Sequence, residues 1–239
     1  HLKGDSTLST NEGFRDSTSL TAWVRYMLYA QILIAVISIV SGNLEYQLLS
    51  DYQNGVYTSQ EQAIADGEAN DQRQGLIGIL YLIVFVVSGF LILRWIHRAN
   101  YNARQLGAEN MKFSPGWSIG YYFIPILTLW KPYQAMKEIW KASKEPSDWV
   151  SQGISGILPL WWFLWLVSNF LGQAIFRLSM RAEEIQELMS LNIVTQISDA
   201  LDIPLALVFL AIVNRIHSMQ ASRLAGANNQ MQPTAESVG

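Results

Sequence analysis

The sequence predicts an all-α, polytopic integral membrane protein, and three long uncharged runs carry this prediction. Residues 26–44 and 75–93 each contain 19 residues without a charge, and residues 150–176 contain 27. Roughly 20 helical residues cross a hydrocarbon core of about 30 Å, so each run is long enough to span it. Charged residues make up only 15% of the 239 residues and gather between these runs. We therefore expect a chain that crosses a bilayer several times.

The composition argues against several kinds of site. The chain has no cysteine, which removes disulfides, thiolate metal sites and cysteine nucleophiles together. The histidines, His1, His97 and His217, do not stand at ligand spacing. No cofactor signature occurs, and a net charge of −3 without a basic run gives no indication of nucleic-acid binding. We expect no metal, no cofactor and no nucleic acid.

One helical membrane domain is expected between two polar ends. Residues 1–20 form a polar N-terminal arm, residues 21–217 the domain, and residues 218–239 a disordered C-terminal tail. The four predicted spans cover about residues 22–42, 75–94, 157–177 and 197–216. The last span is weak, because its longest uncharged run has only 12 residues, and a full crossing must include Asp202.

A polar connection separates the first two predicted spans. Residues 43–74 contain six acidic residues and one basic residue, a net charge of −5. The carboxylates lack the spacing of a calcium loop, so a solvated exterior face is the simpler interpretation. Ser59 is expected to cap a short helix, with Gln62 three residues later completing a capping box.

The stretch that organises the chain is residues 113–130. It carries no charge, yet Pro115, Gly116, Gly120 and Pro125 interrupt it. Such interruptions make a simple spanning helix unfavourable, because backbone groups in lipid must be satisfied internally. The pattern favours a re-entrant or short broken membrane segment over residues 114–130. Five full transmembrane helices are the alternative.

An amphipathic helix is expected directly after this stretch, over residues 131–143. Pro132 suits the first turn of a helix, and Tyr133, Met136 and Trp140 then fall on one face. Nearby lysines favour an interfacial helix on the anionic cytoplasmic leaflet. Packing against the extended end of the second span is the other interpretation, and the two are compatible.

The distribution of Lys and Arg separates the two topologies. Five spans place nine of these residues inside and seven outside, whereas four spans with a re-entrant segment place thirteen inside and three outside. The positive-inside rule therefore favours four spans with both termini cytoplasmic. The nine tryptophans all fall near the cytoplasmic interface in this arrangement.

Residues 94–143 carry a long mixed motif. It comprises Trp95, Ala99, Asn102, Leu106, Ser114, Pro115, Gly116, Trp117, Gly120, Pro125, Leu129, Trp130, Pro132 and Tyr133. This pattern resembles a family of bacterial membrane proteins catalogued as domain of unknown function 4328. The resemblance implies a location in the bacterial inner membrane and implies no activity, because none is established for the family.

Residues 116–120 also match the G-x-S-x-G nucleophile pattern, with Ser118 at its centre. That pattern needs a strand-turn-helix elbow and a histidine partner, and the flanks here are membrane-like. Gly116 and Gly120 equally form a small-xxx-small pair, which predicts close packing of helices. We therefore expect no enzyme, and an intramembrane serine hydrolase is the least favoured hypothesis.

Polar residues inside the predicted spans are better functional candidates. Asn169, Gln173 and Arg177 stand at i, i+4 and i+8, which places them on one helix face. Asp199 and Asp202, three residues apart, share one side of the last span. We expect both acids to face the bundle, with Arg177 within salt-bridge reach of one of them.

The sequence thus predicts a non-enzymatic membrane protein with a partner-binding, lipid-binding or regulatory role. The alternative is a small channel or transporter that uses the re-entrant segment and the intramembrane polar residues. The expected partners are the lipid bilayer and either a second protein or another copy of the chain.

Overall fold

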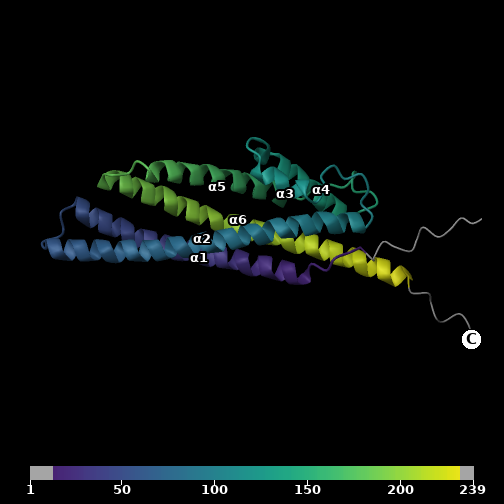
Figure 1. The fold of residues 1–239 in the computed structure, drawn as a ribbon, viewed down its shortest axis with the longest axis horizontal. Helices are drawn as coiled ribbons and strands as arrows, with labels where there is room; N and C mark the ends of the chain where they lie inside the picture. Colours follow the sequence, from purple (N-terminus) through teal and green to yellow (C-terminus); the bar gives the residue numbers. More distant parts are fainter. Residues whose placement is uncertain (1–12, 232–239) are drawn as a thin grey trace, which may run out of the picture. The chain divides into compact units, whose positions relative to one another are not determined.

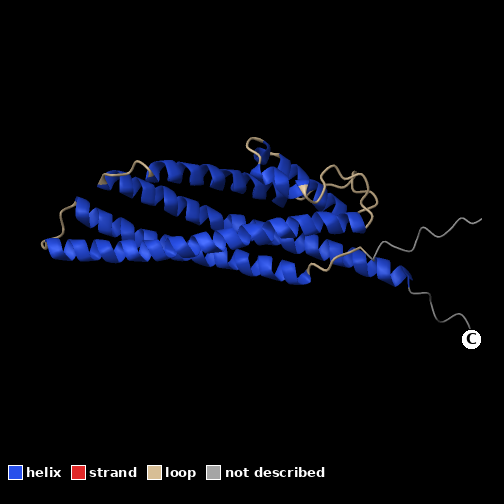
Figure 2. Ribbon diagram, in the orientation of Figure 1, coloured by secondary structure: helices blue, strands red, loops and turns tan. Residues whose placement is uncertain are grey.

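The computed structural model describes residues 13–231, and Figure 2 shows only helices and loops in this part of the chain. In chain order the elements are α1 (Thr18–Gln53), α2 (Gln60–Gln105), α3 (Trp117–Gly120), the 3-10 turns η1 (Tyr121–Phe123) and η2 (Leu127–Leu129), α4 (Lys131–Lys144), α5 (Ile157–Ser179) and α6 (Ile185–Met231). The predicted all-α class is confirmed.

Four of these helices, α1, α2, α5 and α6, are long and apolar enough to cross a membrane. The stretch of residues 113–130 is not among them, because its helical parts are α3 with four residues and two 3-10 turns with three each. A helix rises 1.5 Å per residue, so a four-residue helix advances only about 6 Å. The alternative of five full transmembrane helices is therefore wrong, and four candidate spans are confirmed.

The long helices extend well beyond the predicted spans. The connection expected over residues 43–74 is mostly helical, because α1 continues to Gln53 and α2 begins at Gln60. Ser59 does cap a helix, accepting a hydrogen bond from the Gln62 amide at 3.4 Å. That helix has 46 residues, however, and is not short.

Both ends of the chain are also more helical than expected. Helix α1 begins at Thr18, inside the expected polar arm. Helix α6 continues to Met231, through most of the expected disordered tail, which contains no proline before that point. The rest of both predictions, residues 1–12 and 232–239, lies outside the described residues.

The described residues divide into two compact units. Unit 1 contains residues 13–25, 90–159 and 210–231, and unit 2 contains residues 26–89 and 160–209. The core of unit 1 includes Trp95, Met136 and Ile216, which are all buried. In unit 2, by contrast, the apolar face of α2 is open, and only 6% of its most apolar window is buried.

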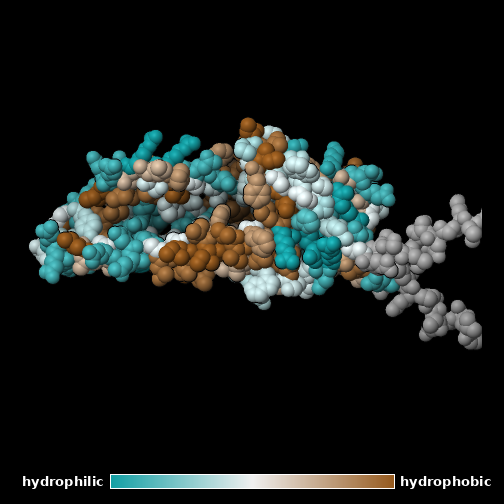
Figure 3. Space-filling view, viewed as in Figure 1, coloured by the Kyte–Doolittle hydropathy of each residue, from teal (hydrophilic) through white to brown (hydrophobic). Residues whose placement is uncertain are grey.

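This open face is an extended apolar surface of unit 2. Figure 3 shows it as a band of hydrophobic side chains over the middle of α2. Leu82, Phe85 and Val86 are among its exposed members. Water would solvate such a surface poorly, whereas lipid hydrocarbon would solvate it well.

Candidate functional site

Residues 113–131, which we call the hairpin, begin and end at the same place in unit 1. The Lys131 ammonium lies 5.7 Å from the centroid of the Phe113 ring. The rings of Phe113 and Tyr121 also meet edge to face, with centroids 5.9 Å apart. Between these residues α3, η1 and η2 all contact α4 (Figure 1). The hairpin therefore returns to its starting point and does not run on in one direction.

The carboxylate of Glu138 in α4 fixes the base of the hairpin. Its Oε1 accepts a hydrogen bond from the Lys112 amide at 2.6 Å, and its Oε2 accepts one from the Phe113 amide at 2.9 Å. Glu138 is only 5% exposed. A buried carboxylate is stable when donors reach both oxygens, and hydrogen bonds to a charged acceptor are the strong kind.

Helix α2 holds the other side of the same peptide. The Phe113 carbonyl accepts hydrogen bonds from Asn100 Nδ2 at 3.0 Å and from Arg104 Nη2 at 2.9 Å. Arg104 also donates to the Met111 carbonyl at 3.0 Å. Both polar groups of the Phe113 backbone are thus satisfied by side chains from two different helices. We call Asn100, Arg104 and Glu138 the clamp.

The motif residues on α2 tie this helix to the rest of unit 1. Asn102 pairs with the backbone of Arg15, accepting from its amide at 3.1 Å and donating to its carbonyl at 2.9 Å. Trp95 donates from Nε1 to the Thr21 hydroxyl at 3.2 Å. The Ala99 carbonyl accepts from Gln220 Nε2 at 2.8 Å. The motif therefore anchors the segment before α1 and the C-terminal part of α6.

Local hydrogen bonds fix the start of α1. Asp16 Oδ1 accepts from the Thr18 amide at 2.9 Å and from the Thr18 hydroxyl at 2.6 Å. These hydrogen bonds from Thr18 lower the pKa of the Asp16 carboxyl. Arg98 of α2 donates to the Asp16 carbonyl at 2.9 Å, so the segment is held from both sides.

The Ser-Pro-Gly-Trp part of the motif makes the turn into the hairpin. Ser114 Oγ accepts from the Trp117 amide at 3.3 Å, and the Ser118 hydroxyl donates to the Pro115 carbonyl at 2.6 Å. The predicted glycine packing pair is wrong. A Cβ atom on Gly116 would meet nothing within 4 Å, and one on Gly120 would first meet the Trp117 ring at 3.2 Å. These glycines serve the turn and do not form an interface between helices.

The tip of the hairpin, residues 123–126, is apolar and open. Phe123 is 72% exposed and Ile126 is 69% exposed, and Figure 3 shows hydrophobic atoms at the outer edge of this segment. Ile126 has a φ of +70°, which is an outlier for a β-branched residue. Strain of this kind costs roughly 1–3 kcal/mol and persists at functional positions. The exposed Ile126 side chain gains little packing within the protein in return.

Helix α4 does not offer its apolar face to a membrane as an interfacial helix would. Met136, Ile139 and Trp140 are buried inside unit 1, and Ala142 packs in a cluster with Met111. The same cluster includes Ala103 of α2, so α4 packs against the extended end of the second span, as the second interpretation expected. The lysines of α4 occupy the more open side of the helix, where Lys137 lies 5.3 Å from the Tyr133 ring centroid.

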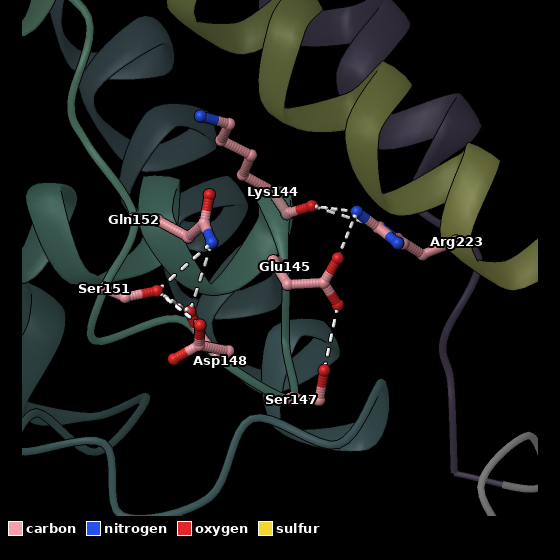
Figure 4. Close-up of polar contacts among 7 residues, drawn as sticks. All are labelled: Lys144, Glu145, Ser147, Asp148, Ser151, Gln152 and Arg223. Carbon is pink, nitrogen blue, oxygen red and sulfur yellow. Dashed lines mark hydrogen bonds and ion pairs between the residues drawn. The ribbon is translucent and has the colours of Figure 1, made fainter.

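The linker after α4 is joined to α6 by one arginine. Arg223 Nη2 lies 2.8 Å from Glu145 Oε2, and Arg223 Nε donates to the Lys144 carbonyl at 3.0 Å. Figure 4 shows this contact beside Ser147, which donates to the same carboxylate at 3.0 Å. Because the ion pair is partly exposed, it orients the linker more than it stabilises the unit.

The intramembrane polar residues lie in unit 2, and their partners differ from those predicted. Asp199 Oδ2 accepts from the Ser38 hydroxyl at 2.5 Å. Asp202 accepts from the Tyr81 hydroxyl at 2.7 Å and from the Ser168 hydroxyl at 2.9 Å. Both acids thus face neighbouring helices, as expected, but their hydrogen-bond partners are hydroxyl groups.

The predicted pairing of Arg177 with these acids is wrong. Among the residues that the structure describes, Arg223 and Glu145 form the one ion pair. Asn169, Gln173 and Arg177 are all exposed, and the Asn169 amide donates to the Trp165 carbonyl of its own helix at 2.7 Å. Helical spacing placed these residues on one face correctly, but it did not reveal which way the face points.

Comparison with known proteins identifies a family that covers the motif. The family model described as Domain of unknown function (DUF4328) matches residues 59–218, which is more than half of the chain and includes the whole motif. No curated protein and no solved structure matches the chain. On the strength of the family match, the chain belongs to the DUF4328 family.

Proposed function

We propose that the protein is a non-catalytic, lipid-binding protein of the bacterial inner membrane, and that its hairpin enters and leaves the cytoplasmic leaflet. One observation carries the proposal: a hairpin closed at its base, where Lys131 meets Phe113, presents an exposed apolar tip. The tip combines Phe123 and Ile126 and has no charged residue. An apolar tip on a rigid base is suited to insertion between acyl chains.

The clamp supports the same proposal. Irregular backbone is tolerated at membrane depth only where its polar groups are satisfied by protein or water. Glu138, Asn100 and Arg104 satisfy the Phe113 peptide at the point where the hairpin begins. The Ser118 hydroxyl is likewise engaged with the Pro115 carbonyl, which suits a structural role better than a nucleophilic one.

The charge distribution supports the proposed topology. Four spans with both termini cytoplasmic place thirteen of the sixteen Lys and Arg residues inside. Four of the thirteen are Lys131, Lys137, Lys141 and Lys144 of α4. Each cation near an anionic leaflet contributes about 1 kcal/mol of attraction. The lysines of α4 would hold unit 1 against the surface that the tip enters.

A single fluorophore tests the proposed insertion, because the chain has no cysteine. The Phe123→Cys variant would carry an environment-sensitive nitrobenzoxadiazole label in vesicles of anionic phospholipid. We expect quenching by lipids that bear a spin label near the headgroup and little quenching by aqueous iodide. The matched control is Ser151→Cys in the exposed linker, which should show the reverse. Iodide quenching at residue 123 equal to that at residue 151 would refute insertion.

The strained tip allows a separate prediction. Ile126→Gly should raise the free energy of unfolding by about 1 kcal/mol, because relief of the φ strain exceeds the entropy cost of glycine. The same change should weaken vesicle binding, because it deletes the exposed side chain. Ile124→Gly is the control, since Ile124 has a φ of −98° and gains no such relief. A loss of stability at both positions, measured by thermal unfolding in detergent, would show that Ile126 is not strained.

A small channel or transporter is the second candidate function, and one observation favours it. Asp199 and Asp202 are carboxylates within a candidate span, and hydroxyl groups of three other helices contact them. Acids at such positions are costly and often mark ion or proton pathways. A flux assay in liposomes decides the matter: Asp202→Asn should fold normally and abolish flux if the protein transports. Absence of flux in the unaltered protein would remove this candidate.

A further inference from the structure

Unit 2 contains a cavity that the lipid-binding proposal does not use. It has a volume of about 400 Å³ and lies among the polar end of α1, the first turns of α2 and the first half of α6. Hydrophilic side chains cover most of the end of the unit where α1 and α2 join (Figure 3). A cavity of this size is within the usual range for small-molecule sites.

The charged groups of the cavity wall are all acidic. Glu45, Asp71 and Asp199 line it, and none of the lining residues is Lys, Arg or His. Arg73 does not line the cavity but lies directly behind its wall, where it donates to Ser41 Oγ at 2.9 Å and to Oδ1 of the lining residue Asn70 at 2.6 Å. The potential inside such a wall attracts cations and repels anions.

Asp199 is the most deeply buried of the three acids in the cavity wall. It is only 5% exposed, and its Oδ2 accepts from the Ser38 hydroxyl. Among the described residues, no hydrogen bond is formed to its Oδ1. Oδ1 is not among the fully buried side-chain atoms that lack a partner in the described residues. Because Asp199 lines the cavity, this oxygen is accessible to a molecule inside it and is free to accept a hydrogen bond. A ligand in the cavity that carries an N–H group can supply the donor.

The second carboxylate is held in place by amide side chains. Asn192 Nδ2 donates to Glu45 Oε2 at 2.6 Å and to the Gly42 carbonyl at 3.0 Å. Gln196 Nε2 in turn donates to Asn192 Oδ1 at 2.6 Å. This chain of amides orients Glu45, so that less entropy is lost when a ligand binds to it.

The wall favours an organic cation over a metal ion. No group of three or more acidic or histidine side chains converges closely enough to hold a metal within the described part of the chain. Leu48, Leu49, Leu188 and Leu191 instead provide apolar surface, and Tyr52 adds an aromatic ring. We propose that this cavity binds a small organic cation, whose ammonium group is held by Asp199 and Glu45 and whose apolar part lies against the leucines.

Thermal unfolding of the purified full chain in detergent micelles tests this site. The probes are benzylamine, choline and putrescine, and neutral benzyl alcohol is the matched control for benzylamine. A ligand that binds the folded state raises the unfolding midpoint with concentration. We expect at least one of the three cations to do so, and benzyl alcohol to have no effect. Failure of all three cations, or an equal response to benzyl alcohol, would overturn the proposal.

Charge-neutral variants locate the binding. Asp199→Asn and Glu45→Gln should each weaken affinity for the effective cation about tenfold or more, because each removes a carboxylate that would pair with its ammonium group. Glu68→Gln is the control, since Glu68 is exposed on the same unit and does not line the cavity. Unchanged affinity in Glu45→Gln would overturn the site even if Asp199→Asn does not fold. These binding measurements report on unit 2, whereas the fluorophore at residue 123 reports on unit 1, so either proposal can fail without the other.

Discussion

Glu138→Ala is expected to lower the free energy of unfolding by roughly 3–5 kcal/mol. The change removes the acceptors of the partly buried Lys112 amide and of the buried Phe113 amide, and leaves both donors unpaired at the base of the hairpin. Each unsatisfied buried amide costs about 1–3 kcal/mol. A cavity at a position that is only 5% exposed adds to this cost.

Two matched variants separate the clamp from a general effect of charge. Glu109→Ala removes an exposed carboxylate from the same unit and should change the unfolding midpoint little. Glu138→Gln keeps one acceptor oxygen but presents an NH2 group to the second amide. The free energy of unfolding should therefore fall by less than in Glu138→Ala. Equal midpoints for Glu138→Ala and Glu109→Ala, measured by thermal unfolding in detergent, would exclude the clamp.

Trp95→Ala should destabilise unit 1 to a similar extent, by about 3–5 kcal/mol. The ring is 1% exposed and fills the core of the unit. Its Nε1 also donates to the buried Thr21 hydroxyl at 3.2 Å. Trp95→Phe keeps most of the side-chain volume but loses that hydrogen bond. The free energy of unfolding should therefore fall by a smaller amount, of which the lost bond accounts for about 1 kcal/mol.

Trp23 supplies the control for this prediction, because it belongs to the same unit and is 55% exposed. Trp23→Ala should change the unfolding midpoint in detergent far less than Trp95→Ala does. If the two alanine variants unfold together, the motif tryptophan is not a core residue.

The four helices that are long and apolar enough to cross a membrane were predictable from the sequence, whereas the ends of the helices were not. Uncharged runs such as residues 75–93 carry a hydropathy signal that follows directly from the thickness of a bilayer. Polar turns that continue a helix into water, such as the first turns of α2, carry no such signal. Their helicity depends on propensity and on neighbouring contacts, which a hydropathy pattern does not contain.

The candidate site was predicted in outline and missed in detail. Pro115, Gly116 and Pro125 indicated a broken segment, and the structure makes a hairpin there. Glu138 was missed, because an acid on an amphipathic helix is usually solvated. The sequence feature that could have revealed Glu138 is its place on the same helix face as Ala135 and Ile139. A carboxylate on such an apolar face needs hydrogen-bond donors nearby.

The partners of the intramembrane acids could not be derived from spacing alone. Asp199 and Asp202 lie on one side of α6, as their separation implies. The hydroxyl groups of Ser38 and Tyr81 belong to other helices, and sequence periodicity does not give the rotation of one helix against another. Arg177 was predicted as the partner because its charge is opposite to that of the acids, but the acids accept hydrogen bonds from neutral hydroxyl groups instead.

We expect the hairpin to return to the membrane face from which it starts. Single cysteines would replace Glu109, which precedes the hairpin, and Ser151, which follows α4. A third would replace Thr58, in the turn between α1 and α2. All three positions are exposed. Labelling with an impermeant maleimide in intact cells is predicted to modify only the cysteine at 58, and permeabilised cells should label all three. Labelling at 151 but not at 109 in intact cells would contradict the account, because the chain would then cross the membrane between them.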